Sequence, residues 1–414
     1  PDICFFSLFA FCYAQPAIEL ASEIKSLKPA ITICIGGAGV AAYPDYFIRN
    51  QAIDFAFTAE AETCLNEFLA QLHSPAPDFS SVPGLWRKEK QGRYRSTVPV
   101  LTTPQDIELM CVKTHETSRR IYLSTSLSRG CPRQCRFCAN HLSHGKPFRA
   151  VEKSVAIEKI SAALHTYHNP AKEIGLNFED DNILADPDYF LSILAALKES
   201  APPFTFATEN GIDYTFLTQS LLEYLVDLGM RQANISIGTS HNHIAEKENR
   251  TFNKKHFESI INALNLLKIP SITYFICGLK GDTRESIAET LSYLSILHTL
   301  TGISLFYAVP GLPDFTDKTI FGKNLPSLCC GSSAYPWNES LTTQTMVTAF
   351  RLSRYINICK QPSPSPQDRA LIEKIRSERR LYTLVNKGDK KIFLPVENMD
   401  DELVGMVLAE YLAE

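Results

Sequence analysis

The chain has 414 residues, of which 45% are hydrophobic and 21% are charged, and its formal net charge is −4. This length exceeds one ordinary hydrophobic core, so we expect two domains and a smaller appendage. The slight negative net charge argues against a generally basic surface for binding nucleic acid or membrane lipid. The longest apolar runs have the length of strands and are too short to span a membrane.

Residues 1–75 alternate strand-like and helix-like patterns, and we expect them to form a Rossmann-like (flavodoxin-like) domain with a parallel sheet covered by helices. The chain starts at Pro1 without an initiator Met and enters a strand directly, so we expect the true N-terminus to lie upstream. The predicted strands are Ile3–Phe9, Ile31–Ile35 and Ile53–Phe57, and the helices follow at 16–27, after Pro44 and through 64–69.

Residues 76–120 contain four prolines and a predicted hairpin near 84–94, which is typical of a linker. From residue 121 to 359 six strands alternate with helices, and this pattern predicts a partial (β/α)6 TIM-like barrel with its site at the carboxyl ends of the strands. The six strands are predicted at 121–127, 173–178, 204–208, 232–237, 272–277 and 303–308, with helices at about 152–167, 187–199, 215–228, 255–267, 283–298 and 342–358.

A proline-rich stretch ends the last helix of the barrel near residue 360. We expect residues 360–414 to form a small α+β appendage. A helix of alternating charge comes first, then a hairpin with its turn at 387–389, and then a closing amphipathic helix.

Three cysteines lie within eight residues directly after the first predicted barrel strand, at Cys131, Cys135 and Cys138. Three thiolates suit a four-iron cluster with one open iron better than a closed zinc site, which takes four ligands. A zinc site is the alternative, because the neighbouring His141 or His144 could supply a fourth ligand. The other nine cysteines are scattered, and most lie in apolar runs, so we expect them to be reduced thiols in the hydrophobic core. Reduced thiols also favour a cytoplasmic location.

The spacing Cys-x-x-x-Cys-x-Phe-Cys, with Phe137 as the aromatic residue, resembles the cluster loop of the radical S-adenosylmethionine (SAM) superfamily. The resemblance implies a 4Fe-4S cluster whose open iron chelates SAM, and reductive cleavage of SAM to a 5′-deoxyadenosyl radical. It also implies SAM contacts for residues at the ends of later strands: Phe137, Glu179, Asp180, Ser236, Gly238, Ile276 and Gly278.

Two departures from the family pattern qualify these contacts. Phe178, Glu179 and Asp180 stand where the family often has Gly-Gly-Glu, and Tyr274 replaces the first glycine of the segment that backs the adenine. A helix N-cap or a solvated acidic turn is the alternative explanation for the carboxylates, and a plain serine-rich turn is the alternative for Ser236.

The N-terminal domain carries a second resemblance. Ser7, the pair Gly36 and Gly37, and the run Glu60-Ala61-Glu62 are similar to the later part of the cobalamin-binding domain that precedes many radical SAM cores. This resemblance implies that Ser7, Gly36 and Gly37 line the cleft for the cobalamin nucleotide tail. The strands that carry a cobalt-ligating histidine in some members are absent, so the lower axial ligand is undetermined.

These patterns together predict a cytoplasmic, cobalamin-dependent radical SAM enzyme that methylates an unactivated centre of a small molecule or peptide, with flavodoxin or ferredoxin as reductant. No catalytic residue, substrate or oligomeric state is assigned. The alternatives are an oxidative cyclase or rearrangement enzyme, a methylthiotransferase, a radical SAM enzyme whose N-terminal domain is a cobalamin-free docking module, and a non-enzymatic iron-sulfur protein.

Overall fold

The computed structural model describes residues 2–89, 93–317, 319–323, 325–387 and 390–411. They form two compact units, one made of residues 1–204 and 308–333 and the other of residues 205–307 and 334–414. The chain therefore leaves the first unit and returns to it for 26 residues. The domain boundaries expected at 75, 120 and 359 stay a prediction.

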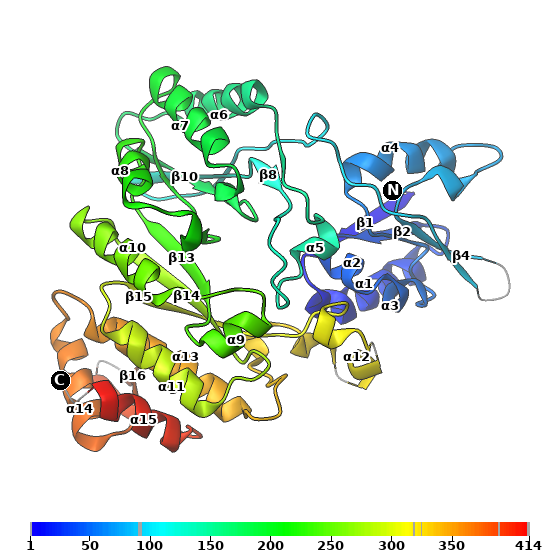
Figure 1. The fold of residues 1–414 in the computed structure, drawn as a ribbon. Coiled ribbons are helices and arrows are strands. Elements are labelled where there is room, and N and C mark those ends of the chain that lie inside the picture. The colour runs from blue at the N-terminus through cyan, green and yellow to red at the C-terminus, as the bar shows by residue number, and fades with distance from the viewer. Residues whose placement is uncertain (1, 90–92, 318, 324, 388–389, 412–414) are drawn as a thin grey trace. The chain divides into compact units, whose positions relative to one another are not determined.

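The first unit opens with a five-stranded sheet whose first three strands are parallel, as expected for a Rossmann-like domain. Figure 1 shows α4 on one face of this sheet and α1 to α3 on the other. The predicted hairpin also forms, and it extends the sheet by two antiparallel strands. The elements are β1 (Ile3–Ser7), α1 (Ala14–Leu27), β2 (Thr32–Gly36), α2 (Ala38–Ala42), α3 (Pro44–Ile48), β3 (Phe55–Phe57), α4 (Ala61–Leu72), β4 (Leu85–Lys88) and β5 (Tyr94–Ser96).

Aromatic rings form the core between this sheet and α4. Phe68 is fully buried and meets the rings of Phe55 and Phe57 edge to face, each at 5.0 Å between centroids. Cys34 and Cys64 are buried in the same cluster, so they are core thiols, as the sequence predicts. Burial raises the pKa of Cys34 to about 12, which keeps that thiol protonated.

A second sheet of the first unit contains the strand that leads to Cys131, Cys135 and Cys138. β7 (Arg120–Thr125) pairs in parallel with β10 (Glu173–Phe178), and α6 (Lys153–Tyr167) and α7 (Pro187–Ser200) follow these strands. Thr125 stands opposite Phe178, so the residues that follow both strands leave the sheet at the same edge. The antiparallel strand β6 (Val112–Glu116) was not expected, because all five of its residues are exposed and give no buried periodicity.

The returning segment, residues 308–333, packs on the rest of the first unit. It contains α12 (Thr319–Lys323) and the short 3₁₀ turns Pro313–Phe315, Pro326–Leu328 and Gly331–Ser333. Phe321 is buried, and its ring lies 6.0 Å from that of Phe11. Asp314 forms an ion pair of 3.1 Å with Arg136, which lies between the second and third clustered cysteines.

The second unit contains a parallel sheet in the order β12 (Ile212–Asp213), β13 (Ala233–Gly238), β14 (Ser271–Cys277) and β15 (Leu300–Leu305). The eight strands and helices expected in this half all form within four residues of their predicted bounds. β15 starts three residues early, because Leu300 already pairs with Ile272. The other elements are β11 (Thr205–Ala207), α8 (Gln219–Asp227), α9 (Asn242–Lys247), α10 (Lys254–Leu266), α11 (Arg284–Ser295) and α13 (Thr343–Cys359).

The appendage forms as predicted, with α14 (Pro366–Glu378), the antiparallel pair β16 (Tyr382–Lys387) and β17 (Lys390–Pro395), and α15 (Asp401–Tyr411). Residues 388 and 389 of the expected turn lie outside the described residues. Arg284 of α11 pairs with Asp400 at 2.9 Å, just before α15. Within the described ranges, no helix combines the length and apolar character that crossing a bilayer requires.

Replacing Phe68 by Ala tests the aromatic core of the N-terminal sheet. The change removes a fully buried ring, so we expect it to lower the free energy of unfolding by about 3–5 kcal/mol. The measurement is urea unfolding followed by far-ultraviolet circular dichroism. Leu27→Ala, at a side chain that is 81% exposed, is the control and should leave the midpoint nearly unchanged. Equal midpoints for the two variants would contradict this packing.

Candidate active site: the cysteine loop and the N-terminal cavity

The cysteine loop, residues 130–148, is closed at its base by a short antiparallel ribbon of β8 (Ser128–Arg129) and β9 (Arg149–Ala150). Gly130 has a φ of +82°, and a Cβ there would lie 2.2 Å from the carbonyl oxygen of Pro147. Only glycine fits this turn into the first cysteine. Cys135 is buried and Cys131 and Cys138 are half-buried, so the loop shields its thiols on one side.

Residues after β10 hold the start of the cysteine loop in place. The carboxylate of Asp181 accepts hydrogen bonds from the Gly130 amide and the Asn140 side chain, both at 2.8 Å. It also lies 2.9 Å from Nδ1 of His144. The Asn182 amide nitrogen lies 3.6 Å from the Cys131 sulfur. The sequence predicted an acidic run at this strand end. It did not predict that Asp181, Asn182 and His144 hold the cysteine loop, because these contacts form only when β10 pairs with β7 in the folded sheet.

The two carboxylates predicted to contact SAM differ in their surroundings. Asp180 is 4% exposed and accepts hydrogen bonds from the Leu127 amide at 3.1 Å and the Ser128 hydroxyl at 2.5 Å. Burial raises the pKa of Asp180 to about 7, although these hydrogen bonds act in the opposite direction. Glu179 is exposed and accepts hydrogen bonds from Ser124 and Asn177. A SAM contact for either residue stays a prediction, and exposure favours Glu179.

The thiols of the cysteine loop suit an iron-sulfur cluster. Thiolates are the ligands of such clusters, and the three thiols come from one loop as the expected ligand set requires. Burial raises the pKa of Cys138 to about 11, so iron must displace a proton when it binds there. Among the residues that the structure describes, no three His, Cys, Asp or Glu side chains gather as they would around one metal ion. A four-iron cluster is larger than one ion and needs ligands that stand further apart.

The other predicted SAM contacts lie at strand ends of the second unit. Ser236 and Gly238 lie at a bulge in β13, where Gly238 has a φ of +77°. Ile276 is half-buried in β14, and Gly278 follows that strand with a φ of +97°. The Gly278 amide donates to Asp282 at 2.8 Å, a bond that the sequence analysis did not foresee. Contacts of these residues and of Phe137 with SAM stay predictions.

A cavity of about 460 Å³ lies at the carboxyl ends of β1, β2 and β3. Ser7, Gly36 and Gly37 line it, and their contact with a cobalamin nucleotide tail stays a prediction. Arg129 of the ribbon and His144 of the cysteine loop also line it. The cavity of the N-terminal domain and the cysteine loop thus share a wall. Gly37 has a φ of +98°, and a Cβ there would lie 2.6 Å from the Leu8 carbonyl oxygen, so close backbone packing by itself already requires this glycine.

Two acidic residues of the N-terminal domain bind two arginines of the ribbon at this wall. Glu60 forms a two-pronged ion pair with Arg149, at 2.8 and 2.9 Å, and both side chains are less than a tenth exposed. Glu62 pairs with Arg129 at 2.5 Å, and Arg129 also lies 3.3 Å from Glu60. Burial alone would raise the pKa of Glu60, but hydrogen bonds from Arg149 and Thr102 outweigh it and lower the pKa to about 2.

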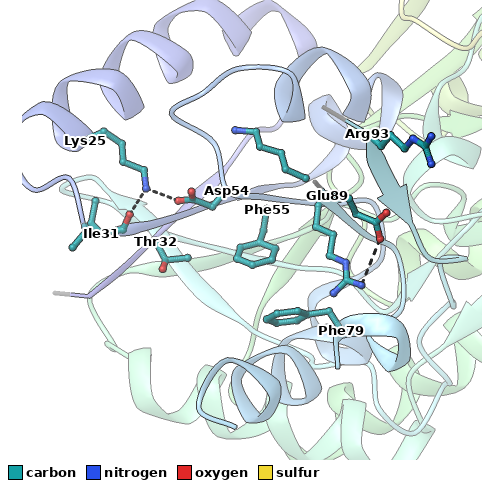
Figure 2. A pocket seen from close by; sticks show the side chains of 11 residues that line it. Lys25, Ile31, Thr32, Asp54, Phe55, Phe79, Glu89 and Arg93 are labelled. Atoms are coloured by element: carbon teal, nitrogen blue, oxygen red, sulfur yellow. Dashed lines mark hydrogen bonds and ion pairs between the residues drawn. The ribbon is translucent and has the colours of Figure 1, made fainter. Parts of the chain in front are cut away.

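A second recess, of about 850 Å³, lies at the opposite edge of the N-terminal sheet (Figure 2). Three of its basic side chains already have partners within the protein. Lys25 pairs with Asp54 at 2.7 Å, and Lys88 donates to the Asn50 and Ile53 carbonyl oxygens, each at 2.7 Å. Arg87 lies over the Phe79 ring at 5.5 Å. These contacts explain the charges without a ligand, so the cavity beside the cysteine loop is the candidate site.

The fold and the site define an α/β protein with a thiol loop at a parallel strand end, next to a cavity of the N-terminal sheet. Residues 125–294 match the Radical SAM superfamily. The chain is 23% identical over 262 residues to bacteriochlorophyllide d C-12(1)-methyltransferase of Chlorobaculum tepidum, a match that covers 60% of this chain and 56% of that relative. The chain thus spans little more than half the length of that curated relative.

Two solved structures share the fold. One is TsrM from Kitasatospora setae, a radical S-adenosylmethionine methyltransferase with cobalamin and a [4Fe-4S] cluster bound, with a TM-score of 0.61, 16% identity, and coverage of 76% of this chain and 63% of that one. The other is apo OxsB, a cobalamin-dependent S-adenosylmethionine radical enzyme, with a TM-score of 0.65, 12% identity, and coverage of 100% and 71%. Residues 125–294 therefore carry the match to the radical SAM superfamily, and the fold of the chain is similar to that of these two solved structures.

Replacing Gly130 by Ala tests the turn into the cysteine loop. The added Cβ meets the Pro147 carbonyl oxygen, so the turn must open and move Cys131. We expect iron binding after anaerobic reconstitution to fall roughly 10–100-fold, as for other changes to the support of metal ligands. Gly281→Ala is the matched control, because Gly281 also has a positive φ but its Cβ would meet no atom within 4 Å. Normal iron and sulfide content in the Gly130 variant would refute the predicted constraint.

Replacing Glu60 by Gln tests the buried ion pair through its pH dependence. The folded-state pKa lies below the ordinary 4.5, so the pair stabilises the protein fully above pH 4.5 and less as the pH falls toward 2. We expect Glu60→Gln to cost about 3–5 kcal/mol at pH 7, because it leaves Arg149 unpaired. This difference from the wild type should shrink below pH 4.5.

The measurement is urea unfolding of both proteins between pH 7 and pH 3. Glu173→Gln provides the control, since the Arg120–Glu173 pair is exposed and should contribute less than about 1 kcal/mol. A stability difference that stays constant over this pH range would contradict an ionised Glu60.

Proposed function

We propose that this protein is a cobalamin-dependent radical SAM enzyme that methylates an unactivated centre of a small molecule or peptide. The observation that carries the proposal is the shared wall between the N-terminal cavity and the cysteine loop. An enzyme that combines two cofactors in one reaction must hold them close together and fixed in orientation. The relatives whose names specify methyltransferase or cobalamin-dependent activity support this reading.

The chain's own residues would bind the cofactors and shield them. Cys131, Cys135 and Cys138 would hold the 4Fe-4S cluster, and Glu179 would accept a hydrogen bond from the SAM amino group. When bound, the cluster with SAM supplies a 5′-deoxyadenosyl radical and the corrinoid supplies the methyl group. Ser7, Gly36 and Gly37 would contact the cobalamin nucleotide tail, and the cavity volume lies in the range of a tail-sized ligand rather than of a whole corrinoid.

A second function is a radical SAM enzyme whose N-terminal domain binds no corrinoid. One observation favours it: Gly37 and Gly39 are required by close packing on the backbone of Leu8 and Ala10, so these glycines do not need a ligand to explain them. In that case the N-terminal domain would act as a docking module or lid. Cyclisation and rearrangement use the same cofactor architecture and differ in the substrate. For all these readings we propose a cytoplasmic location and a flavodoxin or ferredoxin as reductant.

The test is anaerobic reconstitution with iron, sulfide and hydroxocobalamin, followed by desalting and an ultraviolet-visible spectrum. We expect retained corrin absorbance, together with formation of 5′-deoxyadenosine and S-adenosylhomocysteine when SAM and a reductant are added. Cys135→Ala should abolish SAM cleavage, whereas the control Cys111→Ser, outside the cysteine loop, should keep it.

A protein that cleaves SAM but retains no corrin would refute the proposal and leave the docking module in its place. A protein that binds corrin and cleaves SAM without forming S-adenosylhomocysteine would point to cyclisation or rearrangement.

A further inference from the structure

The base of the cysteine loop places two positive charges opposite each other. In the ribbon of β8 and β9, Arg129 stands directly across from Arg149. Like charges directly opposite on neighbouring strands repel each other, so this ribbon is unstable without nearby negative charge. The ribbon has only two residue pairs and little area of its own to hold it closed.

The compensating charge comes from the N-terminal domain, far away in sequence. Glu60 and Glu62 lie at the start of α4, just beyond the end of β3. Glu60 contacts both arginines of the ribbon, and Glu62 contacts Arg129. Arg149 extends the contact further, because it donates to the Thr102 and His144 carbonyl oxygens at 2.7 Å each. Both carboxylates and Arg129 also line the N-terminal cavity. A ligand in this cavity therefore lies against the groups that keep the cysteine loop closed.

We infer that Glu60 and Glu62 are positioning residues that transmit occupation of the N-terminal cavity to the cysteine loop. The inference rests on the proposed function, because it takes a corrinoid as the ligand of the cavity. A ligand that fills the cavity removes water from around Glu62 and Arg129, whose side chains are 23% and 21% exposed. The ion pairs then strengthen, because charges attract more strongly in a medium of low dielectric constant. The ribbon tightens, and the loop that carries the three cysteines becomes more ordered.

The consequence is cooperative assembly of the two sites. Corrinoid binding would stabilise the cysteine loop before or during cluster insertion, and a cluster in the loop would in turn favour corrinoid binding, since coupling between two sites is reciprocal. Such coupling would make cluster assembly less favourable when the N-terminal cavity is empty.

Hydrogen–deuterium exchange of the apo-protein tests this without any catalytic readout. In the wild type, we expect added hydroxocobalamin to slow amide exchange in residues 128–150 by about five-fold or more. In Glu62→Gln, we expect faster exchange in the same residues and little slowing by hydroxocobalamin. Glu62 is the main test because its side chain is 23% exposed, so the variant should fold even if Glu60→Gln does not. Glu173→Gln, which alters an ion pair of the same unit away from the loop, should behave as the wild type.

The corrin absorbance retained after desalting separates failure of this inference from failure of the proposed function. A wild type that retains no corrin refutes both. A wild type that retains corrin but shows no change of exchange in residues 128–150 refutes the coupling alone. The coupling is also refuted if Glu62→Gln retains corrin and slows its loop exchange as the wild type does. Arg129→Lys should reproduce the loss of coupling, because lysine keeps the charge but not the two-sided contact with Glu60 and Glu62.

Discussion

The ion pair between Glu60 and Arg149 is the interaction on which the candidate site depends. Both side chains are nearly buried, and a buried charge is tolerated only when its partner and its hydrogen bonds are in place. Arg149 ends the cysteine loop, and Glu60 begins the helix that covers the N-terminal sheet. One contact therefore links the cavity of the N-terminal domain to the loop that carries the three clustered cysteines. Chemistry that uses both sites needs a constant distance between them.

The cysteine loop is held from two directions by different kinds of contact. On the side of β10, Asp181 binds the Gly130 amide and the side chains of Asn140 and His144, so neutral donors and one histidine fix the loop. On the side of the N-terminal domain, full charges meet at the ribbon. The returning segment adds a third contact through Asp314 and Arg136. The thiols are thus carried by a loop with little regular structure whose shape is set by its surroundings.

The comparisons agree with this reading at the level of fold and family. The radical SAM match covers the cysteine loop and most of the later strands, and the structural likeness extends to the N-terminal sheet. Sequence identity to the solved structures is 12–16%, so the likeness fixes the fold and leaves the substrate open. The N-terminal cavity supplies the observation specific to this chain, because its own residues join it to the loop.

The sequence alone determined the features that are local or periodic. The spacing of Cys131, Cys135 and Cys138 predicted the family. The alternation of apolar strands and helices predicted most of the parallel strands, because such patterns repeat over a few residues. Only the tertiary structure decided the contacts between distant residues. Glu60 and Arg149 are 89 residues apart, and Arg136 and Asp314 are 178 apart. A sequence does not show whether a charged residue will be buried or exposed. It also does not show which charged residues will pair, because that depends on where the strands end in the folded sheets.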